Sequence, residues 1–239
     1  MRHLRRSGIV AEKAQAANFL SENHKYERKM ACRKWSKKKV NFNQIIFTDE
    51  KRFNLDGPDN WISYVRQGTR IIRNKRPCGG GSIMILGMIN STGQLNVKKV
   101  TENMNSRKYI DILSDFAVPY LKNKFGKKFI LQQDNCPAHV SRETMNYINK
   151  TAKIQNIEWP ARSPDLNIIE NVWSMLSDIV YDGPQPRNLK ELEQRIIDGV
   201  STINNENSEK IKKLYNSMPD RVLEVFTISI YKRLKLGLV

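Results

Sequence analysis

The hydrophobic pattern of this 239-residue chain changes its period near residue 100. Before that point, turn residues separate short apolar runs from stretches in which apolar and polar residues alternate. This pattern predicts strands joined as a meander, at residues 44–55, 61–66, 82–89 and 94–100. Beyond it, apolar residues recur at every third or fourth position from Tyr109 to Tyr120, as on one face of a helix. Gly126 is expected to end this helix.

The second half of the chain alternates between helices and short strands. Apolar runs predict strands at residues 129–131 and 154–159, and helices are expected at residues 141–150, 189–203 and 208–226, the last interrupted at Pro219. Ser163, Pro164 and Asp165 suit the N-cap and first turn of one more helix. We therefore predict an α/β fold, with a mixed sheet of a three-strand meander plus two further strands, flanked by helices.

Composition divides the chain into three predicted parts. Residues 1–40 are basic and sparsely apolar, so we expect a helical linker or docking arm there, with a weak helix around residues 14–20 and a second around residues 30–35. Residues 41–205 hold the predicted sheet and form the main domain. Residues 206–239 are expected to add a C-terminal helical extension.

Positive charge is concentrated rather than spread along the chain. The formal net charge is +17, and residues 1–40 hold twelve Lys and Arg against three Glu. The basic positions expected to contact a polyphosphate are Lys37, Lys38 and Lys39 and an acid-free cluster of Arg66, Arg70, Arg73, Lys75 and Arg76. Charge alone leaves open DNA, RNA or simply a solvated basic surface.

Several protein classes are disfavoured by the sequence. The longest apolar stretch, at residues 83–89, is far shorter than the ~20 residues of a membrane helix. The three cysteines are widely spaced, and the three histidines are scattered, so neither a disulfide framework nor a zinc site is expected. We expect a soluble intracellular protein that does not contact a membrane.

Three carboxylates stand where the local pattern does not call for them. Asp49 and Asp134 each follow a short apolar run, so both are expected at or near the end of a buried strand. A turn or capping role would also explain either aspartate. Glu170 is the one charged residue between Leu166 and Ser177, on an apolar helix stripe, where a carboxylate is costly unless it is paired, protonated or metal-bound. A buried ion pair is the alternative for Glu170.

Together these three carboxylates suggest one site at an edge of the sheet. Carboxylate oxygens without nearby His or Cys suit Mg²⁺ or Mn²⁺ rather than zinc. Two such ions about 3.5–4 Å apart would clamp the attacking and leaving oxygens of a phosphoryl transfer. A basic chain with such a site fits a nuclease or polynucleotidyl transferase.

Five segments resemble, in order along the chain, motifs of the Tc/mariner superfamily of DNA transposases: Phe47–Phe53, Gly79–Met84, Phe129–His139, Trp159–Trp173 and Ser217–Pro219 with Arg221. The resemblance implies a ribonuclease-H-like catalytic domain of the glutamate-bearing kind, with metal ligation by Asp49, Asp134 and Glu170. It places Asn135 and His139 beside the site, with His139 as a neighbour rather than a ligand; a purely structural histidine is the alternative.

The implied activity is metal-dependent hydrolysis at transposon ends, followed by attack of the freed 3′-hydroxyl on double-stranded target DNA, usually at a TA step, which deforms easily. Two Mg²⁺ or Mn²⁺ ions per site, a homodimer on DNA and a nuclear location are expected with it. Only 48 residues precede Asp49, so we expect most of the family's N-terminal helix-turn-helix region to be missing.

Two other functions stay open at this point. A truncated or co-opted transposase could bind DNA without cutting it, which the short N-terminal segment favours. A ribonuclease acting on RNA–DNA hybrids would share the fold but not the Trp159–Trp173 motif.

Overall fold

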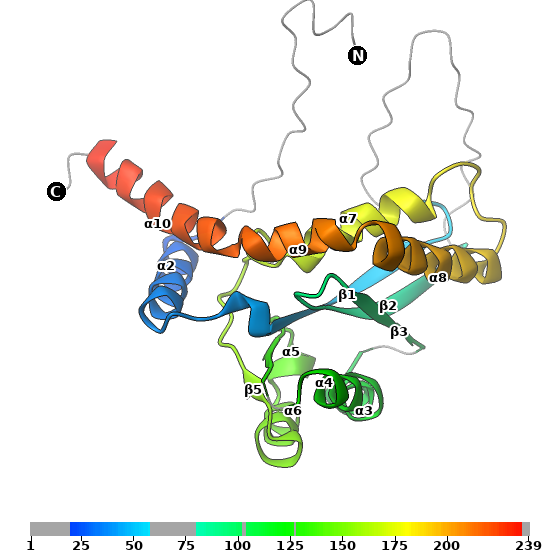
Figure 1. Ribbon diagram of the computed structural model, residues 1–239, viewed down its shortest axis with the longest axis horizontal. Coiled ribbons are helices and arrows are strands. Elements are labelled where there is room, and N and C mark those ends of the chain that lie inside the picture. Colours follow the sequence, from blue (N-terminus) through cyan, green and yellow to red (C-terminus); the bar gives the residue numbers. More distant parts are fainter. Residues whose placement is uncertain (1–19, 58–79, 102–103, 127, 236–239) are drawn as a thin grey trace, which may run out of the picture.

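The computed structural model describes residues 20–57, 80–101, 104–126 and 128–235, with the backbone alone from residue 227 on. Within this part of the chain, one five-stranded sheet lies between two layers of helices (Figure 1). The predicted strand at residues 61–66 and the predicted weak helix at residues 14–20 lie outside the described residues.

The sheet is mixed, as predicted. Its order is β3-β2-β1-β4-β5, with bounds β1 Ile45–Asn54, β2 Ser82–Ile89, β3 Leu95–Val100, β4 Ile130–Gln132 and β5 Gln155–Asn156. β1, β2 and β3 pair antiparallel, whereas β4 runs parallel to both β1 and β5. The three-strand meander plus two further strands is therefore confirmed, and the last predicted strand, residues 154–159, is shorter than expected because β4 offers it only a three-residue partner.

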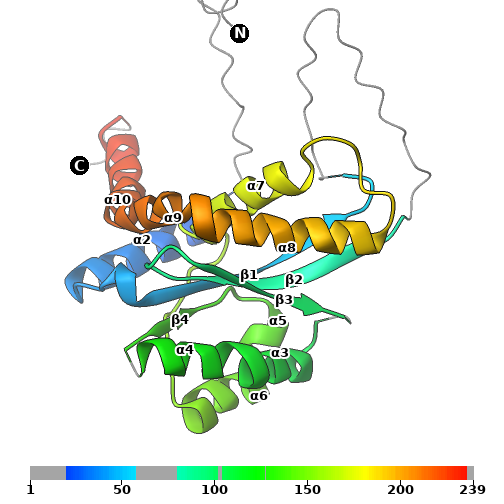
Figure 2. The ribbon, with the colours of Figure 1, turned by 45° about the vertical axis from the view of Figure 1, so that its right-hand side comes forward.

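Helices cover one face of the sheet from the two ends of the described chain (Figure 2). They are α2 (Glu22–Lys37), α7 (Ile169–Val180), α8 (Leu189–Glu206), α9 (Ser208–Asn216) and α10 (Met218–Lys235). Their apolar stripes form the larger core with the β-strand side chains that point to this face, such as Ile45, Phe47 and Phe53. Cys32 and Trp35 of α2 belong to this core, so part of the predicted arm packs onto the sheet.

The opposite face is covered by helices from the middle of the chain. They are α3 (Ser106–Ile112), a π-helical turn (Leu113–Ala117), α4 (Val118–Phe125), α5 (Pro137–Val140), α6 (Arg142–Asn146) and a second π-helical turn (Tyr147–Ala152). α4 ends at Gly126, whose φ of 60° few other residues adopt, as predicted. Within the described residues, no helix is long and apolar enough to cross a bilayer.

Two predicted helix boundaries are wrong. The helix expected to open at Ser163 begins at Ile169 instead, because residues 163–168 form successive turns. Asp165, expected in a first helical turn, instead accepts two hydrogen bonds from the buried guanidinium of Arg28. The break expected at Pro219 falls at Ser217, and Pro219 lies in the first turn of α10, where a missing N–H costs nothing.

Candidate functional site

Asp49 lies in the middle of β1, not at its end as expected. β1 continues to Asn54 because β2 pairs with it from Phe47 to Asn54, but the parallel partner β4 reaches only to the register of Phe47. Beyond that register no described strand pairs with this side of β1, and the cleft that Asp49 lines lies there. The position is thus the carboxyl end of the β1–β4 parallel pair, where α/β sheets commonly hold their sites.

The Asp49 carboxylate is held from the helical layer above. Trp173 of α7 donates a 2.9 Å hydrogen bond from Nε1 to Oδ2 of Asp49. The indole reaches it by lying over Gly87, the residue that faces Asp49 on β2. A side chain at Gly87 would meet the indole ring at once, so this glycine provides the room that lets Trp173 touch Asp49.

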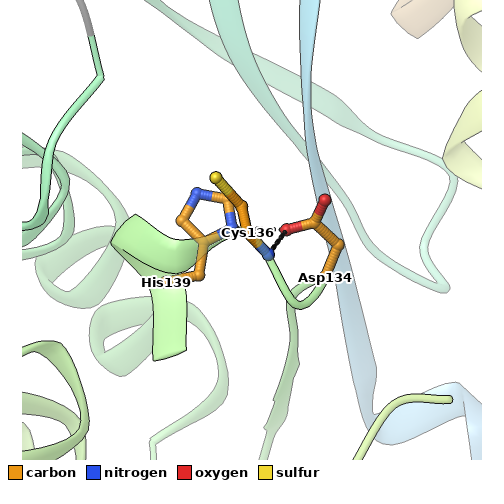
Figure 3. Close-up of side chains that lie close together, drawn as sticks. All are labelled: Asp134, Cys136 and His139. Carbon is orange, nitrogen blue, oxygen red and sulfur yellow. Dashed lines mark hydrogen bonds and ion pairs between the residues drawn. The ribbon is translucent and has the colours of Figure 1, made fainter. Parts of the chain in front are cut away.

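Asp134 lies in the loop between β4 and α5. Its Oδ1 accepts a 2.9 Å hydrogen bond from the backbone N–H of Cys136 and lies 2.6 Å from Nδ1 of His139. Figure 3 shows the side chains of these three residues close together. These two contacts lower the pKa of Asp134, chiefly through the hydrogen bond with His139. The carboxylate is therefore charged and fixed in orientation.

His139 bridges two acidic side chains. Its Nε2 lies 3.1 Å from Oε1 of Glu50, on the face of β1 opposite to that of Asp49, and its ring packs on Tyr109 with centroids 4.0 Å apart. Burial by itself lowers the pKa of His139, but the hydrogen bonds to Asp134 and Glu50 outweigh it and raise the pKa to about 10. His139 therefore contacts Asp134 directly, in agreement with its expected place beside the site.

Glu170 stands in the first turn of α7, and its surroundings differ from those expected. The apolar side chains of α7, including Val172 and Trp173, turn into the core, whereas Glu170 is exposed and faces the cleft described next. Nearby protein atoms still exclude enough water to raise its pKa, which the charge of Lys51 partly offsets. The helix start is secured by Arg221, which donates to the Asp165 carbonyl and to Oδ1 of Asn171.

The three predicted carboxylates line one cleft of about 340 Å³. Asp49 comes from β1, Asp134 from the loop after β4, and Glu170 from α7; the wall between the last two is the segment 159–164 with Asn167. Asn135 also lines the cleft and donates a 3.0 Å hydrogen bond to the carbonyl of Trp159, which ties the Asp134 loop to that wall.

The cleft has an excess of negative charge at its centre. Burial, followed by the charge of Glu170, raises the pKa of Asp49 to about 7, although the Trp173 hydrogen bond opposes the shift. The other charges acting on Asp49, those of Glu50 and Asp134, are negative as well. A buried carboxylate whose pKa is raised further by neighbouring carboxylates is stabilised in its charged form when a cation lies beside it.

The predicted DNA contacts are only partly described. The cluster Arg66, Arg70, Arg73, Lys75 and Arg76 lies outside the described residues. Lys37, Lys38 and Lys39 follow one another at the end of α2 and the turn after it, and all three are exposed.

Sequence reasoning missed three parts of the site: Glu50, the indole of Trp173 and the thiol of Cys136. Glu50 follows Asp49 directly and alternation puts it on the other face of β1, which was the available signal. Trp173 lies three residues after Glu170 in the recognised motif, yet only the fold shows its bond to Asp49. Cys136, two residues after Asp134, lies with His139 and Asp134 in one group whose ligand atoms are within 4.8 Å of one another.

Sequence comparison finds a matching family model and several relatives of this chain. Residues 44–193 match the family model described as DDE superfamily endonuclease. The chain is 37% identical over 226 residues to the transposable element Tc3 transposase of Caenorhabditis elegans, covering 93% of this chain and 67% of the relative. It is 30% identical over 198 residues to the transposable element Tcb1 transposase of Caenorhabditis briggsae, which covers 80% of this chain and 65% of that relative. The chain thus spans about two thirds of the length of these relatives.

Solved structures share the fold at low sequence identity. The paired-end complex of Mos1 transposase with its left transposon end superposes with a TM-score of 0.72 at 18% identity, over 94% of this chain and 68% of that one. The catalytic domain of Mos1 mariner transposase gives a TM-score of 0.64 at 17% identity, over 88% of this chain and 95% of the domain. The ribonuclease-H-like fold predicted from the sequence is therefore confirmed.

Proposed function

Because this chain belongs to the DDE superfamily endonucleases, among the Tc1/mariner transposases, we propose that it cuts phosphodiester bonds at transposon ends and joins the freed 3′-hydroxyls to target DNA. The observation that carries the proposal is the cleft in which Asp49, Asp134 and Glu170 meet from three separate elements. Phosphoryl transfer by divalent ions requires carboxylate ligands gathered in such an opening.

The residues present fit divalent metal ions. The donor set of Asp49, Asp134 and Glu170 is all oxygen, which Mg²⁺ and Mn²⁺ prefer. Burial first and the charge of Glu170 second raise the pKa of Asp49, and a bound cation would offset both effects. We propose that these three side chains hold two ions, and solved Mos1 complexes that contain Mg or Mn are consistent with metal use by this fold.

The bound ions would polarise the scissile phosphate and stabilise charge on the attacking and leaving oxygens. The chain's own residues prepare that site. Trp173 fixes Asp49 through Oδ2, and His139 and the Cys136 N–H fix Asp134 through Oδ1. Asn135 holds the cleft wall at Trp159. Ligands fixed in this way lose little entropy when an ion binds.

The DNA partner follows from charge and from the relatives. We propose that Lys37, Lys38 and Lys39 and the basic cluster at residues 66–76 contact phosphates of double-stranded DNA, including transposon ends and a TA-containing target. Joining two ends needs two active sites, so we propose a homodimer on DNA. The relatives named above are transposases of Caenorhabditis transposable elements, and their DNA substrate lies in the nucleus; we propose that this protein acts there as well.

A nicking assay on supercoiled DNA tests the proposal. Wild-type protein with Mn²⁺ should nick the plasmid, and Asp134→Asn should lower the rate by about 100-fold or more, since several kcal/mol of charge stabilisation depend on the ligand. Asp198→Asn, the same change at an exposed position of α8, is the matched control and should nick like wild type. DNA binding without nicking in any divalent metal would overturn the proposal and favour a non-catalytic DNA-binding remnant.

A further inference from the structure

A second donor set shares Asp134 with the proposed catalytic site. A carboxylate oxygen of Asp134, Sγ of Cys136 and a ring nitrogen of His139 lie within 4.8 Å of one another (Figure 3). The spacing of the cysteines gave no reason to expect zinc, because the usual paired Cys-x-x-Cys is missing. The fold nevertheless collects one sulfur, one nitrogen and one oxygen ligand in six consecutive residues.

The loop that holds these ligands is firmly built. Pro137 starts the short helix α5, and the His139 N–H donates a 2.8 Å hydrogen bond to the Cys136 carbonyl, which closes the turn between the two ligands. Gln133 donates to the His139 carbonyl at 2.9 Å. With Tyr109 packed on its ring, His139 is only 3% exposed. The imidazole is therefore positioned by contacts that do not involve the Cys136 thiol.

The arrangement around His139 is the one found where histidine binds a metal. A ligating imidazole usually gives its second ring N–H to a carboxylate, which fixes the tautomer and strengthens the metal bond. Here Nδ1 faces Asp134, and Nε2 faces Glu50 at 3.1 Å. Glu50 thus already stands where the supporting carboxylate would be needed.

We propose that Asp134, Cys136 and His139 form a binding site for a thiophilic divalent cation such as Zn²⁺ or Cd²⁺. Thiolate and imidazole ligands select such ions over Mg²⁺. On binding, the Cys136 thiol and Nδ1 of His139 each release a proton to water, and the ion takes the place of the proton between His139 and Asp134. Both Asp134 and Cys136 line the cleft, so a fourth coordination position opens toward solvent or DNA.

The required adjustment is small. Zinc bonds of about 2.0–2.3 Å in a tetrahedron place ligand atoms roughly 3.3–3.8 Å apart. The ligand atoms here are already within 4.8 Å, and the 2.6 Å contact between His139 and Asp134 has to widen by only about 1 Å. Because Asp134 is half-exposed, its side chain has room to make that movement.

Occupation of this site would switch the enzyme off, a consequence that rests on the proposed function. A thiophilic ion bound to Asp134 takes a ligand that Mg²⁺ or Mn²⁺ needs in the catalytic site. Excess Mg²⁺ would not readily restore activity, because it competes poorly for a thiolate and an imidazole. The site would therefore make this transposase sensitive to zinc.

Cadmium binding tests the site without any need for activity, through the ultraviolet absorption of a cadmium–thiolate bond. Wild-type protein should show the band at one Cd²⁺ per chain, and Cys78→Ala, which also removes one thiol, should keep it. Cys136→Ala should abolish the band, and Asp134→Asn should weaken Cd²⁺ binding by about tenfold or more. An unchanged band in Cys136→Ala, or unchanged affinity in Asp134→Asn, would overturn the proposal. Circular dichroism checks folding, and Cys136→Ser replaces the alanine variant if that variant unfolds.

Plasmid nicking with Mn²⁺, measured after incubation with Zn²⁺, tests whether zinc at this site inhibits the enzyme. The rate of each variant is compared with its own rate without zinc. Zinc should inhibit wild type and Cys78→Ala by about tenfold or more and leave Cys136→Ala near its zinc-free rate. Equal inhibition of all three would refute the role of this site. If cadmium binds as described but no metal supports nicking, the proposed function fails and the cation site stands. If the protein nicks DNA but shows no cadmium band, the cation site fails and the proposed function stands.

Discussion

Gly87→Ala tests whether a glycine on β2 makes the contact between Trp173 and Asp49 possible. A Cβ atom at residue 87 would lie 2.2 Å from Cη2 and 2.6 Å from Cζ2 of the Trp173 indole, where ordinary contacts are 3.4–4 Å. The ring would have to move by more than about 1 Å, yet Trp173 is only 1% exposed and packed into the larger core.

The expected cost has two parts. Overpacking a close-packed core costs about 1–3 kcal/mol of unfolding free energy, against the roughly 0.5–1 kcal/mol by which alanine in a strand is ordinarily more stable than glycine. The displaced indole also loses its 2.9 Å bond to Asp49, and a hydrogen bond to a charged group is worth about 1.5–3 kcal/mol, or roughly a 10- to 100-fold fall in nicking rate.

Urea unfolding and plasmid nicking measure these two effects. Gly80→Ala is the matched control, since its Cβ would meet Leu55 at ordinary distances of 3.4–3.7 Å, and it should change stability by no more than about 0.5 kcal/mol. Trp173→Phe supplies the other half of a double-mutant cycle, because phenylalanine is shorter and does not reach the position of the clashing atoms. In the Trp173→Phe protein, Gly87→Ala should lower the free energy of unfolding by at least about 1 kcal/mol less than it does in the wild-type protein.

Strictly additive costs in the cycle would refute the reasoning, since they would mean that residue 87 and the indole do not compete for the same space. A Gly87→Ala protein as stable and as active as wild type would refute it as well.

Three further predictions follow from single contacts. Arg28→Met should lower the unfolding free energy by about 1.5–3 kcal/mol, because the buried guanidinium of Arg28 binds both carboxylate oxygens of Asp165. Asp165→Asn, and the double variant, should each lower it by about the same amount, and additive losses in the double variant would contradict the pairing. Tyr215→Phe should cost about 1–2 kcal/mol in urea unfolding, since its hydroxyl lies 2.9 and 2.8 Å from the backbone carbonyls of Ile45 and Ile89; no change would contradict the contact. Asp49→Asn should stabilise the metal-free protein at pH 8. Burial and Glu170 raise the pKa of Asp49 to about 7, so the carboxyl proton of Asp49 is held more tightly in the folded state than in the unfolded state. The contribution of Asp49 to the free energy of unfolding therefore falls as pH rises from about 4 to 7. Thermal melts in EDTA at pH 5 and pH 8 should show wild type and variant diverging at the higher pH, and parallel curves would reject the linkage.

The order of strands and helices could be predicted from the hydrophobic pattern. The apolar runs of β1 and β2 reflect burial on both faces of the sheet, and the helical stripe at residues 109–120 reflects burial on one helix face. The position of Asp49 was less readable. The apolar run stops at Phe47, yet β1 continues, since its length is set by pairing with β2 and not by its own hydrophobicity.

The start of α7 shows the limit of local signals. Ser163, Pro164 and Asp165 satisfy the rules for a helix N-terminus, but Arg28, which is 137 residues away in the chain, binds Asp165 and draws it out of that role. The grouping of Cys136 with His139 and Asp134 was likewise hidden, because it depends on how the loop folds and not on a spacing that metal motifs share.

Joint binding of divalent ions by Asp49, Asp134 and Glu170 can be observed in crystals soaked in Mn²⁺ and measured at the manganese absorption edge. We expect two anomalous peaks about 3.5–4 Å apart in the cleft, which together contact an oxygen of each of the three carboxylates. Peaks that leave out any one of the three side chains, or manganese bound only elsewhere on the protein, would contradict it.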